Sequence, residues 1–155
     1  MDAFTLMKKD HKNVKGLFKK IIKAGDPDEQ ADLFKELKNE LDAHAYMEEN
    51  AFYPAMKEQQ ETHDLALESY EEHHMMKELL EELSELSPES EEWMPKMKVL
   101  QENMEHHIQE EEEEMFPKAK KILGAKAKEV GEEMEQVKKS YLKEHGIEEN
   151  GSADL

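Results

Sequence analysis

Two short motifs of the same form occur in this 155-residue chain, one in each half. They are His44-x-x-x-Glu48 and His107-x-x-x-Glu111. Residues four apart lie on the same face of a helix, about one turn from each other. Each motif can therefore direct one imidazole and one carboxylate toward the same small cluster, an arrangement typical of metal binding.

The two motifs belong to an internal repeat that also places a histidine upstream of each of them. Asp10-His11 and Glu72-His73 are each followed by apolar residues at the same helical spacing. We therefore expect each half to form a helical hairpin, with a histidine on its first helix and the His-x-x-x-Glu pair on its second. The alignment separates three candidates from neighbours of the same type: His73 from His74, His107 from His106, and Glu111 from the run 110–114.

The six candidate ligands are four imidazoles and two carboxylates: His11, His44, Glu48, His73, His107 and Glu111. Imidazole mixed with carboxylate, without sulfur, suits iron or manganese. Six ligands are too many for a four-coordinate zinc site. They suit two metal ions about 3.5–4 Å apart, each bound by two histidines and bridged by the glutamates. An oxo or hydroxo group would complete the bridge.

The alternative is that these residues are ordinary helix residues. A single histidine on an apolar stripe is usually a core residue, and a glutamate in a charge run is usually solvated. However, burying two unpaired carboxylates costs several kcal/mol each, and this chain has no arginine and few lysines on those stripes to pair with them. The set as a whole therefore favours a dinuclear metal site. The other histidines have weaker claims: His63, His74, His106 and His145.

The elements that must position these residues are helices. Helix-forming residues dominate, and apolar residues recur at helical spacing over residues 4–24, from 28 to the late 50s, 62–86 and about 90–123. Pro54 is expected to kink or end the second helix. The sequence thus predicts an all-α fold, an up-down-up-down four-helix bundle over residues 1–124. An additional C-terminal helix at 125–145 would cap the bundle or form a homodimer, and 146–155 would be a flexible tail.

Composition excludes several function classes. The formal net charge is −18, and all 21 basic residues are lysine, so nucleic acid and anionic membrane surfaces are not expected partners. The absence of cysteine excludes disulfides, iron–sulfur clusters and thiolate nucleophiles. No apolar run approaches the length of a membrane span, and residues 1–4 do not begin a signal peptide. We expect a cytoplasmic protein.

Together these motifs resemble the hemerythrin-like proteins with the HHE cation-binding domain. The resemblance covers roughly residues 3–123 and rests on five segments: Asp10-His11, His44-x-x-x-Glu48, Glu72-His73, His107-x-x-x-Glu111 and Met115-Phe116-Pro117. It implies a non-haem di-iron centre bridged by two carboxylates, with the six candidate residues as ligands. It also implies that this centre binds O₂ or a related small ligand such as NO or peroxide.

The chain departs from true hemerythrin at two positions. Lys77 stands where that family has a second histidine four residues after the third-helix ligand, and His107-x-x-x-Glu111 replaces a His-x-x-x-x-Asp pair. The coordination sphere is therefore expected to be more symmetric and more open, which argues against a reversible oxygen carrier. Tyr70, one turn before His73, or a water molecule are the candidates for the vacant position.

Three functions are consistent with these features. The first is a di-iron protein that binds, senses or handles O₂, NO or peroxide. The second is an enzyme that consumes peroxide or NO, or a module that stores or senses iron. The enzyme is less favoured, because acid/base groups near the site are scarce, with Lys77 and Tyr70 the only obvious candidates, and because Glu71-x-x-His74 lacks the partner motif of ferritin-like oxidases. The third is an acidic helical interaction module without a metal.

Overall fold

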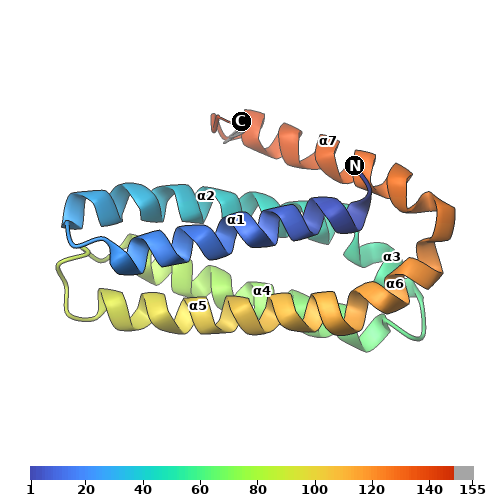
Figure 1. The fold of residues 1–155 in the computed structure, drawn as a ribbon, viewed down its shortest axis with the longest axis horizontal. Coiled ribbons are helices and arrows are strands. Elements are labelled where there is room, and N and C mark those ends of the chain that lie inside the picture. The colour runs from blue at the N-terminus through green and yellow to red at the C-terminus, as the bar shows by residue number, and fades with distance from the viewer. Residues whose placement is uncertain (149–155) are drawn as a thin grey trace.

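Four long helices form the body of the protein in a computed structural model that describes residues 1–148. They are α1 (Ala3–Lys23), α2 (Pro27–Ala51), α4 (His63–Ser84) and α5 (Trp93–Glu110). Figure 1 shows them side by side along one axis, with α1 beside α2 and α4 beside α5. No strand occurs within residues 1–148. The predicted all-α fold, a four-helix bundle with an additional C-terminal helix, is confirmed.

Side-chain caps fix where the first two helices begin. The Asp2 carboxylate accepts a hydrogen bond of 2.8 Å from the Thr5 N–H, and the Asp26 carboxylate accepts one of 3.2 Å from the Glu29 N–H. Each cap satisfies a backbone donor that has no partner within the first helical turn. Pro27 follows Asp26 at the first position of α2, where its missing N–H costs nothing.

The two prolines of the repeat interrupt their helices differently. The helix α2 ends at Ala51, and the short helix α3 (Tyr53–Glu58) begins just before Pro54. In the second half the chain stays helical through a π segment, η1 (Glu111–Met115), into α6 (Phe116–Leu123). The Phe116 N–H reaches back five residues to the Glu111 carbonyl. This wider turn accommodates Pro117, which cannot donate a hydrogen bond and crowds the turn before it.

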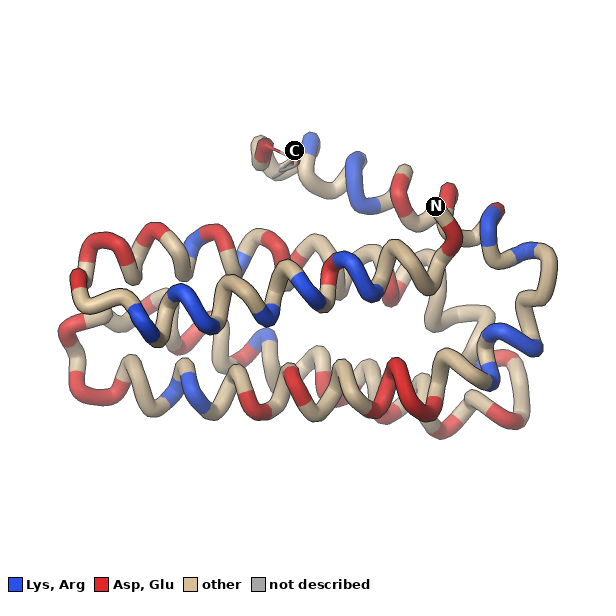
Figure 2. Tube along the Cα trace, in the orientation of Figure 1, with Lys and Arg blue, Asp and Glu red and all other residues tan. Residues whose placement is uncertain are grey.

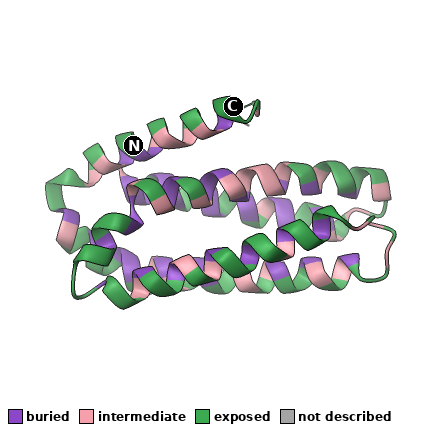
Figure 3. Cartoon of the chain, turned by 180° about the vertical axis from the view of Figure 1, so that it is seen from behind, coloured by how far each residue is buried: buried purple, intermediate pink, exposed green. Residues whose placement is uncertain are grey.

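Two apolar clusters fill the bundle on either side of a polar layer. One cluster includes Val14 of α1 and Leu41 of α2; the other includes Met7 of α1 and Met47 of α2. The positions between these residues carry Asp10, His11 and His44, and Glu48 directly follows Met47. Figure 3 shows the buried residues facing the interior of the bundle. The metal-ligand candidates therefore lie in a dry layer between two packed cores.

The additional helix, α7 (Ala127–Glu144), lies across α1 and α2 and is joined to α6 by a 3₁₀ turn, η2 (Gly124–Lys126). It approaches the N-terminus so closely that a Cβ on Gly131 would stand 2.4 Å from the Met1 carbonyl oxygen. The helix thus covers one side of the bundle within the same chain. Of the predicted tail, residues 149–155 lie outside the described part of the structure.

Charge is distributed unevenly over the helices. Lysines recur along α1, whereas aspartate and glutamate dominate α2 and the second half of α5, as Figure 2 shows. Apart from the buried Glu48, these side chains are at least partly exposed, so the surface is solvated while the apolar clusters stay buried. Among the described residues, no helix is both long and apolar enough to cross a membrane.

Candidate metal centre

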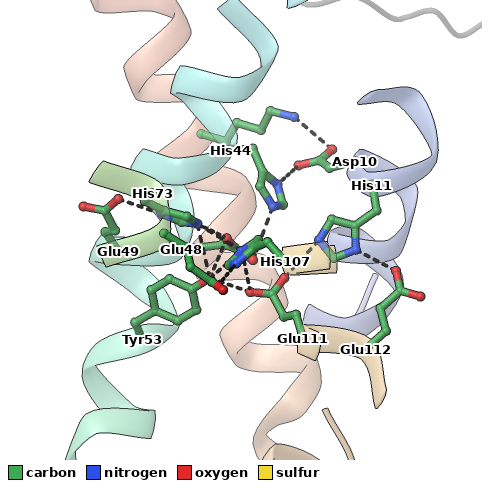
Figure 4. A network of polar contacts seen from close by, with 12 residues as sticks. Asp10, His11, His44, Glu48, Glu49, Tyr53, His73, His107, Glu111 and Glu112 are labelled. Atoms are coloured by element: carbon green, nitrogen blue, oxygen red, sulfur yellow. Dashed lines mark hydrogen bonds and ion pairs between the residues drawn. The ribbon is translucent and has the colours of Figure 1, made fainter. Parts of the chain in front are cut away.

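All six predicted ligands converge on the polar layer of the bundle. Each is at most 6% exposed, and together they come from four helices and the π segment: His11 (α1), His44 and Glu48 (α2), His73 (α4), His107 (α5) and Glu111 (η1). Figure 4 shows their side chains pointing toward one another. The structure brings the six together, and their role as ligands is a proposal developed below.

Their donor atoms form two groups that share one residue. In the first group, donor atoms of His11, His44, Glu48 and Glu111 all lie within 4.8 Å of one another. In the second group, donor atoms of Glu48, His73 and His107 do so. We call these groups the first and the second donor cluster. Because Glu48 belongs to both, its two carboxylate oxygens can serve two adjacent cations.

Every one of the four histidines is held from behind by a carboxylate. The Nδ1-to-oxygen distances are 2.6 Å for His11–Glu112, 2.8 Å for His44–Asp10, 2.7 Å for His73–Glu49 and 2.6 Å for His107–Glu72. A carboxylate at Nδ1 accepts its proton, so in the neutral ring the lone pair is on Nε2, which faces the centre. Such outer partners orient the ligands of metal sites and raise their basicity.

Four buried polar atoms of the first donor cluster have no hydrogen-bond partner within the described residues. They are Nε2 of His11, Nε2 of His44, Oε2 of Glu48 and Oε1 of Glu111. His11 Nε2 lies 2.9 Å from Glu111 Oε1, and His44 Nε2 lies 3.3 Å from Glu48 Oε2, without an aligned hydrogen bond. Leaving such groups unsatisfied is costly, whereas a cation between them would satisfy all four. The donor set therefore fits a metal ion.

Tyr53 occupies the middle of the centre, which the sequence did not indicate. Its hydroxyl oxygen lies 2.9 Å from Oε1 of Glu48 and contacts Oε2 of Glu111. It also lies 3.3 Å from the Nε2 atoms of His73 and His107. Burial, followed by the charges of Glu111 and Glu48, raises the pKa of Tyr53 well above that of a free tyrosine. Its hydroxyl therefore stays protonated while no cation is bound.

The candidate named from the sequence for this position, Tyr70, lies elsewhere. Its hydroxyl donates a 3.4 Å hydrogen bond to the Glu49 carbonyl oxygen rather than to one of the six predicted ligands. Tyr53 was missed because it lies five residues after Glu48, beyond the end of α2, where helical spacing does not predict a shared face. One signal was available in the repeat, which aligns Tyr53 with Phe116, each directly before a proline. The first half thus has a tyrosine hydroxyl where the second half has an apolar ring.

The titration behaviour of the buried histidines follows from their carboxylate neighbours. Burial alone would lower the pKa of His107, but the charge of Glu111 and hydrogen bonds to Glu111 and Glu72 outweigh it and raise that pKa to about 10. Burial would also lower the pKa of His44. The charges of Glu48 and Asp10 and hydrogen bonds to them outweigh burial and raise this pKa well above its usual value. Without a cation, protons on these rings thus balance the buried carboxylates.

The histidines that the repeat did not select lie outside the centre. The side chains of His74 and His106 are 66% and 71% exposed, and each pairs with a glutamate four residues later on its own helix. His63 and His145 contact backbone carbonyl oxygens at helix ends. The repeat therefore distinguishes buried from exposed histidines correctly at two adjacent pairs.

A pocket of about 420 Å³ leads from the surface to the centre. It is lined by residues of α2 and α4, together with Met104 and Tyr141, and two of the ligand candidates, His44 and His73, form part of its wall. Lys77 and Tyr70 also line it. Because one member of each donor cluster lines the pocket, a small molecule bound in it lies beside the centre.

The comparisons with known proteins agree with this geometry. Residues 2–119 match the model of the hemerythrin HHE cation binding domain, and the chain belongs to that family. Its structure is similar to that of a hemerythrin HHE cation binding domain-containing protein of Mycobacterium kansasii, with a TM-score of 0.79 and 28% identity over 93% of this chain and 91% of the other. The resemblance found in the sequence is thus confirmed.

A second relative is longer. A Nostoc protein named DNA nickase is 29% identical over 116 residues, which make up 75% of this chain and 33% of the relative. The chain thus spans about a third of that protein. The comparisons define a hemerythrin-like domain whose histidine and glutamate clusters are suited to bind metal. Which metal and which small ligand it takes stay predictions.

Proposed function

We propose that this protein holds two iron ions in its bundle and binds a small ligand such as O₂, NO or peroxide there. The proposal rests above all on one observation. Two donor clusters share Glu48, and four atoms of the first cluster are buried without a hydrogen-bond partner. The mixture of imidazole and carboxylate without sulfur suits iron. The six ligands are His11, His44, Glu48, His73, His107 and Glu111.

The residues of the centre divide the work between them. Bound iron would supply a redox-active Lewis acid to which a diatomic ligand or peroxide can bind. Glu48 joins the two donor clusters, and Asp10 and Glu49 keep the rings of His44 and His73 in place. The two apolar clusters exclude bulk water from this layer, which strengthens every electrostatic interaction within it.

One observation favours a second candidate, an enzyme that consumes peroxide or NO. Such chemistry needs a proton donor at the reacting ligand. The Tyr53 hydroxyl lies among both carboxylates and two of the histidines, within reach of a ligand bound at the centre. Tyr53 therefore supplies the group that Lys77 and Tyr70 were expected to supply.

The activity named for the Nostoc relative is not extended to this chain. The match covers about a third of that protein, so most of the protein that bears the name has no counterpart in the matched segment. In addition, this chain carries a formal net charge of −18 and contains no arginine, which disfavours contact with a phosphate backbone. The nickase relationship supports the family assignment alone.

Metal content and ligand binding test the proposal directly. We expect protein expressed with iron to carry two iron atoms per chain by mass spectrometry. Anaerobic titration of the metal-free protein with Fe(II) should saturate at the same ratio, and adding NO should change the visible spectrum. The matched pair His73→Ala and His74→Ala provides the control, because only the first should lower the metal content. Protein that binds no iron under these conditions contradicts the proposal.

A further inference from the structure

The C-terminal helix reaches the candidate metal centre through one lysine. On α7, Lys138 Nζ donates to Asp10 Oδ1 at 2.9 Å and to Glu40 Oε1 at 2.7 Å. The other oxygen of Asp10 lies 2.8 Å from Nδ1 of His44, whose Nε2 belongs to the first donor cluster. Figure 4 shows this chain of contacts from Asp10 through His44 to the centre. The region that matches the family model ends at residue 119, before α7 begins.

The four carboxylates behind the histidines are not equivalent. The side chains of Glu112, Glu49 and Glu72 are 29%, 36% and 24% exposed, so water can solvate their remaining oxygens. The Asp10 side chain is only 3% exposed. A buried carboxylate needs a compensating partner, and Lys138 on α7 supplies the ammonium group that contacts Oδ1 of Asp10. Among the four pairs, the Asp10–His44 pair is therefore the one whose carboxylate is covered by α7 and bound by a lysine of that helix.

We infer that Lys138 is a positioning residue for the first donor cluster and that α7 thereby makes the two metal positions unequal. Lys138 holds Oδ1 of Asp10, which fixes the orientation of Oδ2 at His44 and keeps the ring aimed at the centre. Without Lys138, Asp10 loses the ammonium group that holds its Oδ1 and can turn away from the ring. His73 and His107, in the second donor cluster, have outer partners that do not depend on α7.

The inference rests on the proposed metal site, so the experiment separates the two. Metal-free protein is titrated with Co(II), whose visible spectrum reports each ion as it binds. Lys138→Met should weaken one of two binding steps by about tenfold, the lower end of effects seen for outer partners of metal ligands, and leave the other unchanged. Lys138→Arg, which keeps the charge, should restore most of the affinity. Lys139→Met, an exposed lysine on the same helix, should behave as the wild type.

Each result has a defined meaning. Wild-type protein that binds no Co(II) contradicts the proposed metal site itself. Wild-type protein that binds two ions, with Lys138→Met binding both equally well or weakening both alike, overturns the inference while the metal site stands. If circular dichroism shows that Lys138→Met is unfolded, Lys138→Gln decides by the same titration, because it keeps a hydrogen-bond donor without the charge. Loss confined to one step supports the inference in either variant.

Discussion

The Tyr53 hydroxyl oxygen lies 2.9 Å from Oε1 of Glu48, five residues earlier in the chain. On a continuous helix these two side chains would diverge. The break at Phe52 between α2 and α3 turns Tyr53 back over the end of α2, so that its hydroxyl enters the centre. The proline that ends α2 thus also places a proton donor beside the carboxylate common to both donor clusters.

Replacing Tyr53 by phenylalanine tests this role. Tyr53→Phe keeps the buried ring but removes the hydroxyl, so we expect the metal content to stay at the wild-type level. Any turnover of peroxide by the iron-loaded protein should fall by about a hundredfold, the usual effect of losing a positioned acid or base. Metal analysis and an oxygen-evolution or peroxide-consumption assay check this. Tyr70→Phe is the control, and an equal loss in both variants would refute the assignment.

The run of glutamates at the end of α5 allows a sharp test of ligand identity. Glu111 is 2% exposed, whereas Glu113, two residues later, is exposed. Glu111→Gln removes a buried charge of the first donor cluster, so we expect at most one tightly bound ion per chain. Glu113→Gln should retain the wild-type stoichiometry and differ in stability by less than about 0.5 kcal/mol. Metal analysis measures the stoichiometry and urea unfolding measures the stability of both variants, and equal metal content would exclude Glu111 as a ligand.

The sequence predicted the bundle and the convergence of its six donors because both depend on local patterns. Helical spacing places His44 and Glu48 on one face, and the repeat distinguishes His73 from its exposed neighbour. The features that it missed arise from contacts between segments. Whether a proline ends a helix or widens it into a π turn depends on packing, and Lys138 approaches Asp10 only when α7 folds back over the bundle.

The metal-free protein should lose stability as the pH rises above neutrality. The folded-state pKa of His107 is about 10, above the ordinary value of 6.5, and that of His44 is also raised. The stabilisation is therefore complete below about pH 6.5 and is lost as the pH rises through about 10. For Glu48 the folded pKa is lowered, so its contribution is present above about 4.5 and is lost on acidification.

Metal binding should show the opposite dependence on pH. The rings must be deprotonated to bind a cation, so loading releases protons and the affinity increases as the pH rises toward about 10. Urea unfolding of metal-free and Zn(II)-loaded protein at about pH 6 and about pH 9 should show a decline only in the metal-free form. His74→Ala serves as the control and should keep this decline. A metal-free protein equally stable at both pH values would contradict the charged state assigned to His44 and His107.

Two helical glycines differ in the space around them, so alanine should have opposite effects on stability at the two positions. A Cβ on Gly131 would lie 2.4 Å from the Met1 carbonyl oxygen and 2.6 Å from the Ala3 amide nitrogen. Both are backbone atoms, which can move only if the chain itself shifts. Gly131→Ala should therefore displace α7 and destabilise the protein by about 1–3 kcal/mol. At Gly16, within α1, nothing lies within 4 Å, so Gly16→Ala should stabilise it by about 0.5–1 kcal/mol. Urea unfolding measures both changes.

Because Lys138 is on the displaced helix, Gly131→Ala should also reduce the Co(II) affinity of the binding step that depends on Lys138. Unaltered affinity in a destabilised Gly131→Ala protein would show that the position of α7 does not affect metal binding at His44.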